Sequence, residues 1–146
     1  MHSSQDGIGP AAQGELDRLL TTALSLARQR LTESSDFEPF AIIMDTESRI
    51  LAADWDTSPL GKHPEVEELL AASIAQLRHV RDTAHATAIV INTRLARERT
   101  DAIEVRLEHA DGKAVLVLLP YKRAKFGSHA DYGQFSVYSS APEIWS

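Results

Sequence analysis

The sequence predicts a single α/β (α+β) domain in which one mainly antiparallel sheet of five to six strands packs against two long helices. Three observations predict this fold class. The chain has 146 residues, which fits one domain and leaves no room for two. Two segments repeat apolar residues at helical spacing, and five carry the short apolar or alternating runs of strands. Cysteine is absent, so a hydrophobic core must hold the fold without disulfides.

Residues 1–10 are rich in Gly and Ser and are predicted to be a mobile tail, which leaves residues 11–146 for the domain. The first helix is predicted over residues 11–33, and Ser34 begins the polar stretch that ends it. Its apolar positions recur at helical spacing. They are Leu16, Leu19, Leu20, Ala23, Leu24, Ala27 and Leu31.

A β-hairpin is predicted next. The run 41–44 is apolar on both faces, which is typical of a central strand covered on two sides. Residues 45–48 form the turn and residues 49–53 the returning strand.

The second helix is predicted over residues 64–84. Pro64 suits its first position, three glutamates follow in the first turn, and Arg78, His79 and Arg81 lie in the last turns. This distribution of charge complements the helix dipole at both ends.

Three strands follow. The first covers residues 87–95, and the second, 102–109, alternates apolar and charged residues, so that its charged face is predicted to be solvated. An Asp111-Gly112 turn, a strong hairpin signal, leads to residues 114–119, which are apolar on both faces.

Pro120 is predicted to stop this strand. A polar loop follows, then a short sixth strand at the sheet edge over residues 134–138 and a tail at 142–145.

The two fully apolar strands, 41–44 and 114–119, become neighbours in the middle of the sheet if the strand order is 2-1-5-4-3. With this order of elements the chain resembles the roadblock and profilin-like group, small α/β proteins with a five-stranded sheet between helices. The hairpin 40–53, the helix 64–84 and the hairpin 102–119 carry the resemblance. It implies homodimers and adaptor roles around small GTPases.

The segment after Pro120 departs from this group, since it replaces the C-terminal helix that some members have. The stretch 102–109, together with the later Pro120-Tyr121, is also similar to small bacterial proteins that have no assigned activity.

The charge balance limits the kinds of partner. The chain has 21 acidic residues against 15 Lys and Arg, a net charge of −6, which argues against nucleic acid as a partner because that needs a basic surface. The N-terminus has neither the cationic nor the apolar part of a secretory signal. The longest apolar run, 114–120, is too short to span a bilayer. A cytoplasmic protein with no membrane partner is expected.

No catalytic residue, metal site or cofactor is predicted. Cysteine and the G-x-S-x-G pattern are absent, so nucleophilic catalysis finds no support. The histidines form no pair at helical i+3 or i+4 spacing and no H-E-x-x-H motif. They are His2, His63, His79, His85, His109 and His129.

Two loops hold the candidate binding residues. The first contains a concentrated group of cations and aromatics that could hold a phosphate or an acidic partner or could simply be a mobile surface loop. Its candidates are Tyr121, Lys122, Arg123 and Lys125. The second contains Asp54 and Asp56, which suit acid–base or Mg²⁺ chemistry or a turn. Trp55 between them either anchors an interface or folds back onto the core.

These observations favour a protein-interaction or adaptor module without enzymatic activity, a homodimer that binds protein through a helix face or an open sheet edge at the third strand. Two alternatives remain. One is a toxin-neutralising, immunity-type protein whose acidic first sixty residues cover a basic enzyme surface. The other is a small-molecule-binding domain that uses the loops 54–63 and 121–129.

Overall fold

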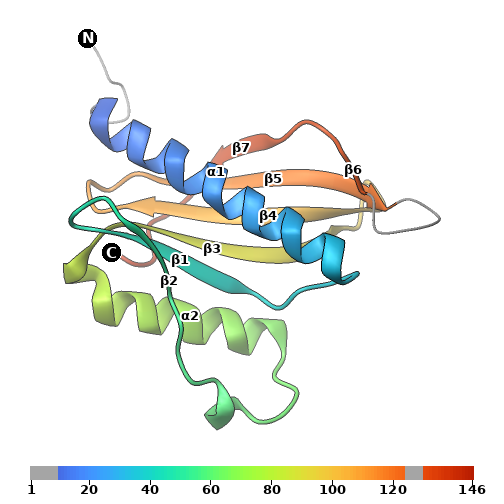
Figure 1. The fold of residues 1–146 in the computed structure, drawn as a ribbon, viewed down its shortest axis with the longest axis horizontal. Coiled ribbons are helices and arrows are strands. Elements are labelled where there is room, and N and C mark those ends of the chain that lie inside the picture. The colour runs from blue at the N-terminus through green and yellow to red at the C-terminus, as the bar shows by residue number, and fades with distance from the viewer. Residues whose placement is uncertain (1–9, 124–129) are drawn as a thin grey trace.

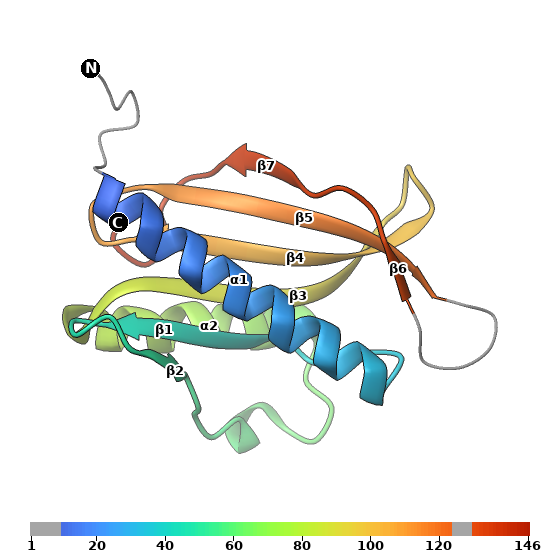
Figure 2. The same ribbon diagram turned by 45° about the horizontal axis from the view of Figure 1, so that its top comes forward.

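In a computed structural model, two helices pack on opposite faces of a curled antiparallel sheet, which is an α+β fold (Figure 1). The structure describes residues 10–123 and 130–146. Helix α1 (Pro10–Glu33) runs diagonally across one face, and α2 (Val66–Val80) lies against the other (Figures 1 and 2). The tail predicted for residues 1–10 lies outside the described residues except for Pro10, which begins α1.

Within the described residues, the sheet has seven strands. In chain order they are β1 (Phe40–Asp45), β2 (Ile50–Ala52), β3 (Ala84–Leu95), β4 (Thr100–His109), β5 (Ala114–Arg123), β6 (Ala130–Tyr132) and β7 (Ser136–Ser139). Across the sheet the order is β2-β1-β3-β4-β5-β6, and β7 pairs with another part of β5. The short edge strand predicted near residues 134–138 is therefore present as β7, whereas β6 was not predicted.

The predicted strand order 2-1-5-4-3 is wrong, because β1 pairs with β3 and not with β5. The physical reason is the length and burial of β3. It has twelve residues, and residues 86–91 are all buried, so it lies between β1 and β4 in the middle of the sheet. In β5, Leu116 and Leu118 are only partly buried, because α2 does not cover that part of the sheet. The strand order of roadblock and profilin-like proteins is thus not found, and the third strand is not an edge.

The strand β5 also runs past Pro120 to Arg123, which corrects the predicted stop. Pro120 lies opposite Ala102 of β4, and its carbonyl accepts a hydrogen bond of 2.9 Å from the N–H of Gly133, on the other side of β5. Because the backbone groups of Pro120 face away from β4, the missing proline N–H removes no hydrogen bond between these two strands.

The helices follow the predicted periodicity, with shorter ends for α2. Buried positions of α1 recur at helical spacing from Ala12 to Leu31. Helix α2 begins at Val66 because Glu65 is its N-cap, in a capping box where the Glu68 carboxylate accepts a hydrogen bond from the N–H of Glu65 at 3.0 Å. Pro64 therefore precedes the cap and is not the first helical residue. After α2 a short 3₁₀ turn, Arg81–Thr83, leads directly into β3.

Two apolar cores lie on the two faces of the sheet. The larger fills the space between α1 and strands β1, β3, β4 and β5. The smaller lies between α2, β1 and β3, and it includes Ile144 from the end of the chain. No helix in the part of the chain that the structure describes is long and apolar enough to cross a membrane.

Candidate functional site

The strand β7 forms an edge of the sheet (Figure 2). It pairs with β5, Val117 lying opposite Val137, and among the described residues no strand pairs with its other side. The N–H of Ser140 donates to the carbonyl of Ala114 at 3.0 Å. Because backbone groups point to alternate sides along a strand, Val137 and Ser139 direct their N–H and C=O groups away from β5.

This edge is apolar, exposed and uncharged. Phe135 and Val137 are each 54% exposed and Tyr138 is 52% exposed. Residues 132–142 contain no charged side chain. Proteins commonly protect an exposed edge from pairing with lysine, proline or a bulge, and Ser136–Ser139 carries neither lysine nor proline.

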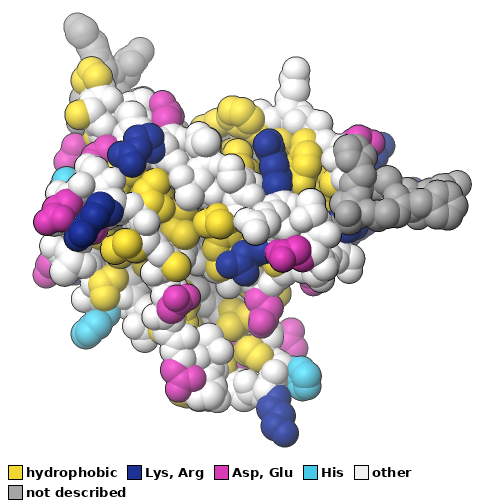
Figure 3. All heavy atoms as spheres, viewed as in Figure 1, with side chains coloured by type: hydrophobic (Ala, Val, Ile, Leu, Met, Phe, Trp, Pro, Cys, Tyr) yellow, Lys and Arg dark blue, Asp and Glu magenta, His cyan; other side chains and the backbone are white. Residues whose placement is uncertain are grey.

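A groove of about 250 Å³ lies between this edge and α1, lined mainly by apolar residues together with Gln13, Asp17 and Lys113. Phe135 and Val137 form one wall, Val115 and Val117 belong to the floor, and Leu16 on α1 belongs to the opposite wall. Figure 3 shows hydrophobic side chains at the surface beside α1 and towards this edge of the sheet.

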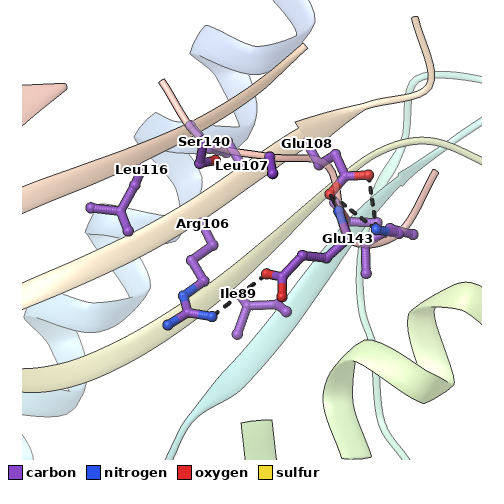
Figure 4. Close-up of a pocket in the computed structure, with 10 residues that line it drawn as sticks. Ile89, Arg106, Leu107, Glu108, Leu116, Ser140 and Glu143 are labelled. Atoms are coloured by element: carbon purple, nitrogen blue, oxygen red, sulfur yellow. Dashed lines mark hydrogen bonds and ion pairs between the residues drawn. The ribbon is translucent and has the colours of Figure 1, made fainter. Parts of the chain in front are cut away.

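A second pocket, of about 270 Å³, lies on the opposite face of the sheet (Figure 4). Strands β3, β4 and β5 form one side of it, and the end of the chain, which we call the terminal segment (residues 140–146), closes the other. Ile89 and Leu116 contribute apolar surface to its lining, and Arg106 points towards Glu143.

The carboxylate of Glu108 anchors the terminal segment. It is 6% exposed and accepts hydrogen bonds from three consecutive backbone N–H groups, those of Glu143 at 2.7 Å, Ile144 at 2.9 Å and Trp145 at 2.6 Å. The charged face predicted for residues 102–109 is therefore not wholly solvated, because the terminal segment covers its last glutamate. The ion pair between Glu104 and Arg106, at 2.7 Å, is also partly covered, with the Glu104 side chain 14% exposed.

Two arginines bind the backbone carbonyls of the same segment. The side chain of Arg78 donates to the carbonyl of Glu143, and that of Arg81 donates to the carbonyl of Ile144 at 2.7 Å. Arg106 lies 3.6 Å from the carboxylate of Glu143. The backbone of the terminal segment is thus bound through its donors and its acceptors.

A third polar cluster surrounds Glu15 of α1. Its carboxylate accepts hydrogen bonds from the hydroxyl of Ser48 at 3.0 Å and from the Nε2 of His109 at 2.9 Å, and it lies 3.2 Å from the Nδ1 of His85. The N–H of Asp111 donates to the Nδ1 of His109, so the ring hydrogen of His109 lies on Nε2, facing Glu15. The cluster ties α1 to the β1–β2 turn and to the ends of β3 and β4.

Burial of Glu15 by itself would raise the pKa of this carboxyl, but the hydrogen bonds from His109, His85 and Ser48 outweigh it and leave the pKa below its ordinary value. Within residues 10–123 and 130–146, no three or more His, Asp or Glu side chains form a group that could hold a metal ion.

We expect Glu15→Gln to flatten the dependence of stability on acid pH. Because the folded-state pKa of Glu15 is lowered, the ionised carboxylate stabilises the fold above its ordinary pKa, and this stabilisation is lost as the pH falls through the lower, folded value. Thermal unfolding should therefore show a smaller loss of Tm in the variant than in the wild type between about pH 5 and pH 3. Glu33→Gln, at an exposed position of the same helix, is the control and should follow the wild type. If Tm falls equally with pH in Glu15→Gln and in the wild type, the ionised Glu15 carboxylate does not stabilise the fold.

The basic and aromatic candidates from the sequence take different positions. Tyr121 is 2% exposed and its hydroxyl donates to Asn92 at 2.6 Å; burial, aided by the charge of Asp101, raises its pKa. Lys122 is exposed, and Arg123 donates to the carbonyl of Leu31 at 3.1 Å. Lys125 lies outside the described residues.

The acidic loop lies elsewhere. Trp55 packs against the core beside α2, and Asp54 is exposed next to it. Asp56 accepts a hydrogen bond from the N–H of Ser58 at 2.9 Å, which lowers the pKa of Asp56. Figures 1 and 2 place residues 54–63 and the end of β5 in different parts of the molecule, so the described residues of the two candidate loops do not form one site.

The sequence predicts Glu108 on a solvated charged face and assigns no role to Val137. The absence of charged residues from 132–142 is a signal from which the uncharged β7 surface could have been predicted. Nothing near Glu108 indicates its partners, which lie 35 to 37 positions later in the chain.

Comparisons with protein-family models, with curated proteins and with solved structures find no significant match for this chain. A function for it must therefore be argued from its own residues.

Proposed function

We propose that the protein is a non-enzymatic protein-binding module that forms a homodimer through the free edge of β7. The observation that carries the proposal is an exposed, apolar and uncharged edge strand, with Val137 at its centre. Unpaired strand edges bind other strands through backbone hydrogen bonds, and neighbouring side chains supply specificity.

The charge of the chain favours a second copy as the partner. Each copy has a net charge of −6, so most faces of two copies repel each other. Residues 132–142 carry no charge, and two copies can approach there without placing like charges together.

The backbone geometry favours one register for this dimer. In a two-fold antiparallel pair, Val137 of one copy lies opposite Val137 of the other, and Phe135 lies opposite Ser139. Val137 and Ser139 are the residues of β7 whose backbone groups point away from β5, so the two copies of Val137 can exchange two N–H···O=C bonds. The two sheets then become continuous, and both α1 helices lie on the same side of it.

The mass in solution tests the proposal directly. Size exclusion with light scattering should give about twice 16.1 kDa at low and at moderate salt, because an uncharged interface is insensitive to screening. Val137→Lys places two like charges opposite each other at the two-fold axis. We expect the dissociation constant to rise about 100-fold, which corresponds to roughly 3 kcal/mol.

Leu51→Lys is the matched control, because Leu51 is also an exposed apolar residue, 45% exposed, on the strand β2 at the other end of the sheet. It should leave the dimer intact. A monomeric wild type, or a dimer that Leu51→Lys dissociates and Val137→Lys does not, would refute the proposal.

A further inference from the structure

We infer that the groove holding the terminal segment is a peptide-binding site, occupied here by the chain's own residues 143–145 and open to a partner protein that has a segment of acidic–aliphatic–aromatic sequence able to adopt the same bend. The terminal groove is lined by Glu108, Arg78, Arg81 and the apolar cluster around Ile144. This inference goes beyond the proposed dimer and uses a different part of the surface.

The groove recognises a peptide backbone. Glu108 accepts from the N–H groups of residues 143, 144 and 145, and Arg78 and Arg81 donate to the carbonyls of residues 143 and 144. Charged side chains make all of these hydrogen bonds, which are stronger than neutral ones. None depends on the side chain of the bound residue, so another segment with the same bent backbone can make them too.

Three side-chain positions provide selectivity. Ile144 is 2% exposed and packs in one cluster with Leu77 and Ile89. Glu143 faces Arg106 at 3.6 Å, and Trp145 packs partly buried beside the same cluster. The site therefore favours an acidic residue, then an aliphatic anchor, then an aromatic residue.

The bound segment leaves part of its groove empty. The cavity of about 270 Å³ in Figure 4 is lined by Ser140 and Ala141, which are small, and by Ile89 and Leu116. A partner with a large apolar residue in the place of Ala141 would fill this space and bury additional apolar surface. Such a partner should bind more tightly than the chain's own segment.

The terminal segment can leave without breaking the sheet. The last strand ends at Ser139, and residues 143–145 are held by side chains and not by strand pairing. Local opening of this kind costs less than global unfolding. Because a tethered segment competes at an effective concentration of about 1 mM, a free peptide must exceed that level or bind more tightly to replace it.

The test uses the full chain and a fluorescein-labelled, amidated peptide of sequence Ser-Ala-Pro-Glu-Ile-Trp-Ser, which copies residues 140–146. Ile144→Ser removes the apolar anchor of the segment and so frees the groove. In fluorescence anisotropy this variant should bind the peptide at least tenfold more tightly than the wild type. A second peptide, with Leu in place of Ala, should bind about tenfold more tightly than the first.

Adding Glu108→Gln to Ile144→Ser should weaken peptide binding at least tenfold, whereas adding Glu33→Gln, at an exposed position of α1 on the other face of the sheet, should leave it unchanged. If folded Ile144→Ser binds neither peptide up to millimolar concentration, or binds equally well with Glu108→Gln, the inference is wrong. If Ile144→Ser does not fold, the inference is tested instead by hydrogen exchange of the wild-type protein with and without added peptide. Peptide at several millimolar should speed exchange of the amides of residues 143–145, and unchanged exchange would overturn the inference.

Discussion

Leu19→Ala is expected to lower the free energy of unfolding by about 2–5 kcal/mol. Leu19 lies near the middle of α1, is 0% exposed and belongs to the larger core cluster. The substitution removes buried apolar surface and leaves a cavity between α1 and the sheet, which the strands beneath cannot close without disturbing their pairing. At this chain length, about 2–4 °C of Tm per kcal/mol makes the change plain in a thermal scan.

Leu51→Ala is the control for this experiment. Leu51 is the same residue type but is 45% exposed on β2, so its truncation should change the stability by about 0.5 kcal/mol or less. Both variants need measurement at one protein concentration, because self-association would add to apparent stability. Similar losses for the two leucines would contradict the placement of α1 on the sheet.

Glu108→Ala is expected to cost about 2–4 kcal/mol, because it leaves three backbone N–H groups without their charged acceptor. The segment avoids this loss only by leaving its groove, which exposes Ile144 to water. Hydrogen exchange should therefore show faster exchange at residues 143–145 together with a lower Tm, while the amides of α1 keep their protection relative to the global stability.

Glu104→Ala provides the matched comparison on the same strand. The Glu104 carboxylate pairs with Arg106 among the described residues and accepts no backbone N–H there, so we expect a smaller loss than for Glu108→Ala and unchanged exchange at residues 143–145. Equal losses for the two glutamates would show that Glu108 does not anchor the terminal segment.

Local patterns were sufficient for most of the elements. The spacing of apolar residues predicted α1 within one residue at its start, and the Asp111-Gly112 turn predicted the hairpin of β4 and β5; Gly112 has the positive φ of 104° that this turn requires. Each of these signals acts between residues that are neighbours in the chain, and its energy is nearly independent of the rest of the fold.

The candidate sites could not be predicted in the same way. The alternation in residues 102–109 indicates which side chains share a face, but not what covers that face, and Glu108 is covered by a segment 35 positions later. Tyr121 was expected in a surface loop, yet β5 continues through it and places it in the core under α1.

Side-chain periodicity and turn chemistry act over short distances, so the two helices, the hairpins and the uncharged stretch that becomes β7 follow from local sequence. The position of β3 beside β1, the open edge of β7 and the anchoring of residues 143–145 by Glu108 follow only from the packing of the whole chain. Strand order and long-range anchoring depend on which apolar faces bury each other when the whole chain packs, and similar short apolar runs satisfy several arrangements until that packing selects one.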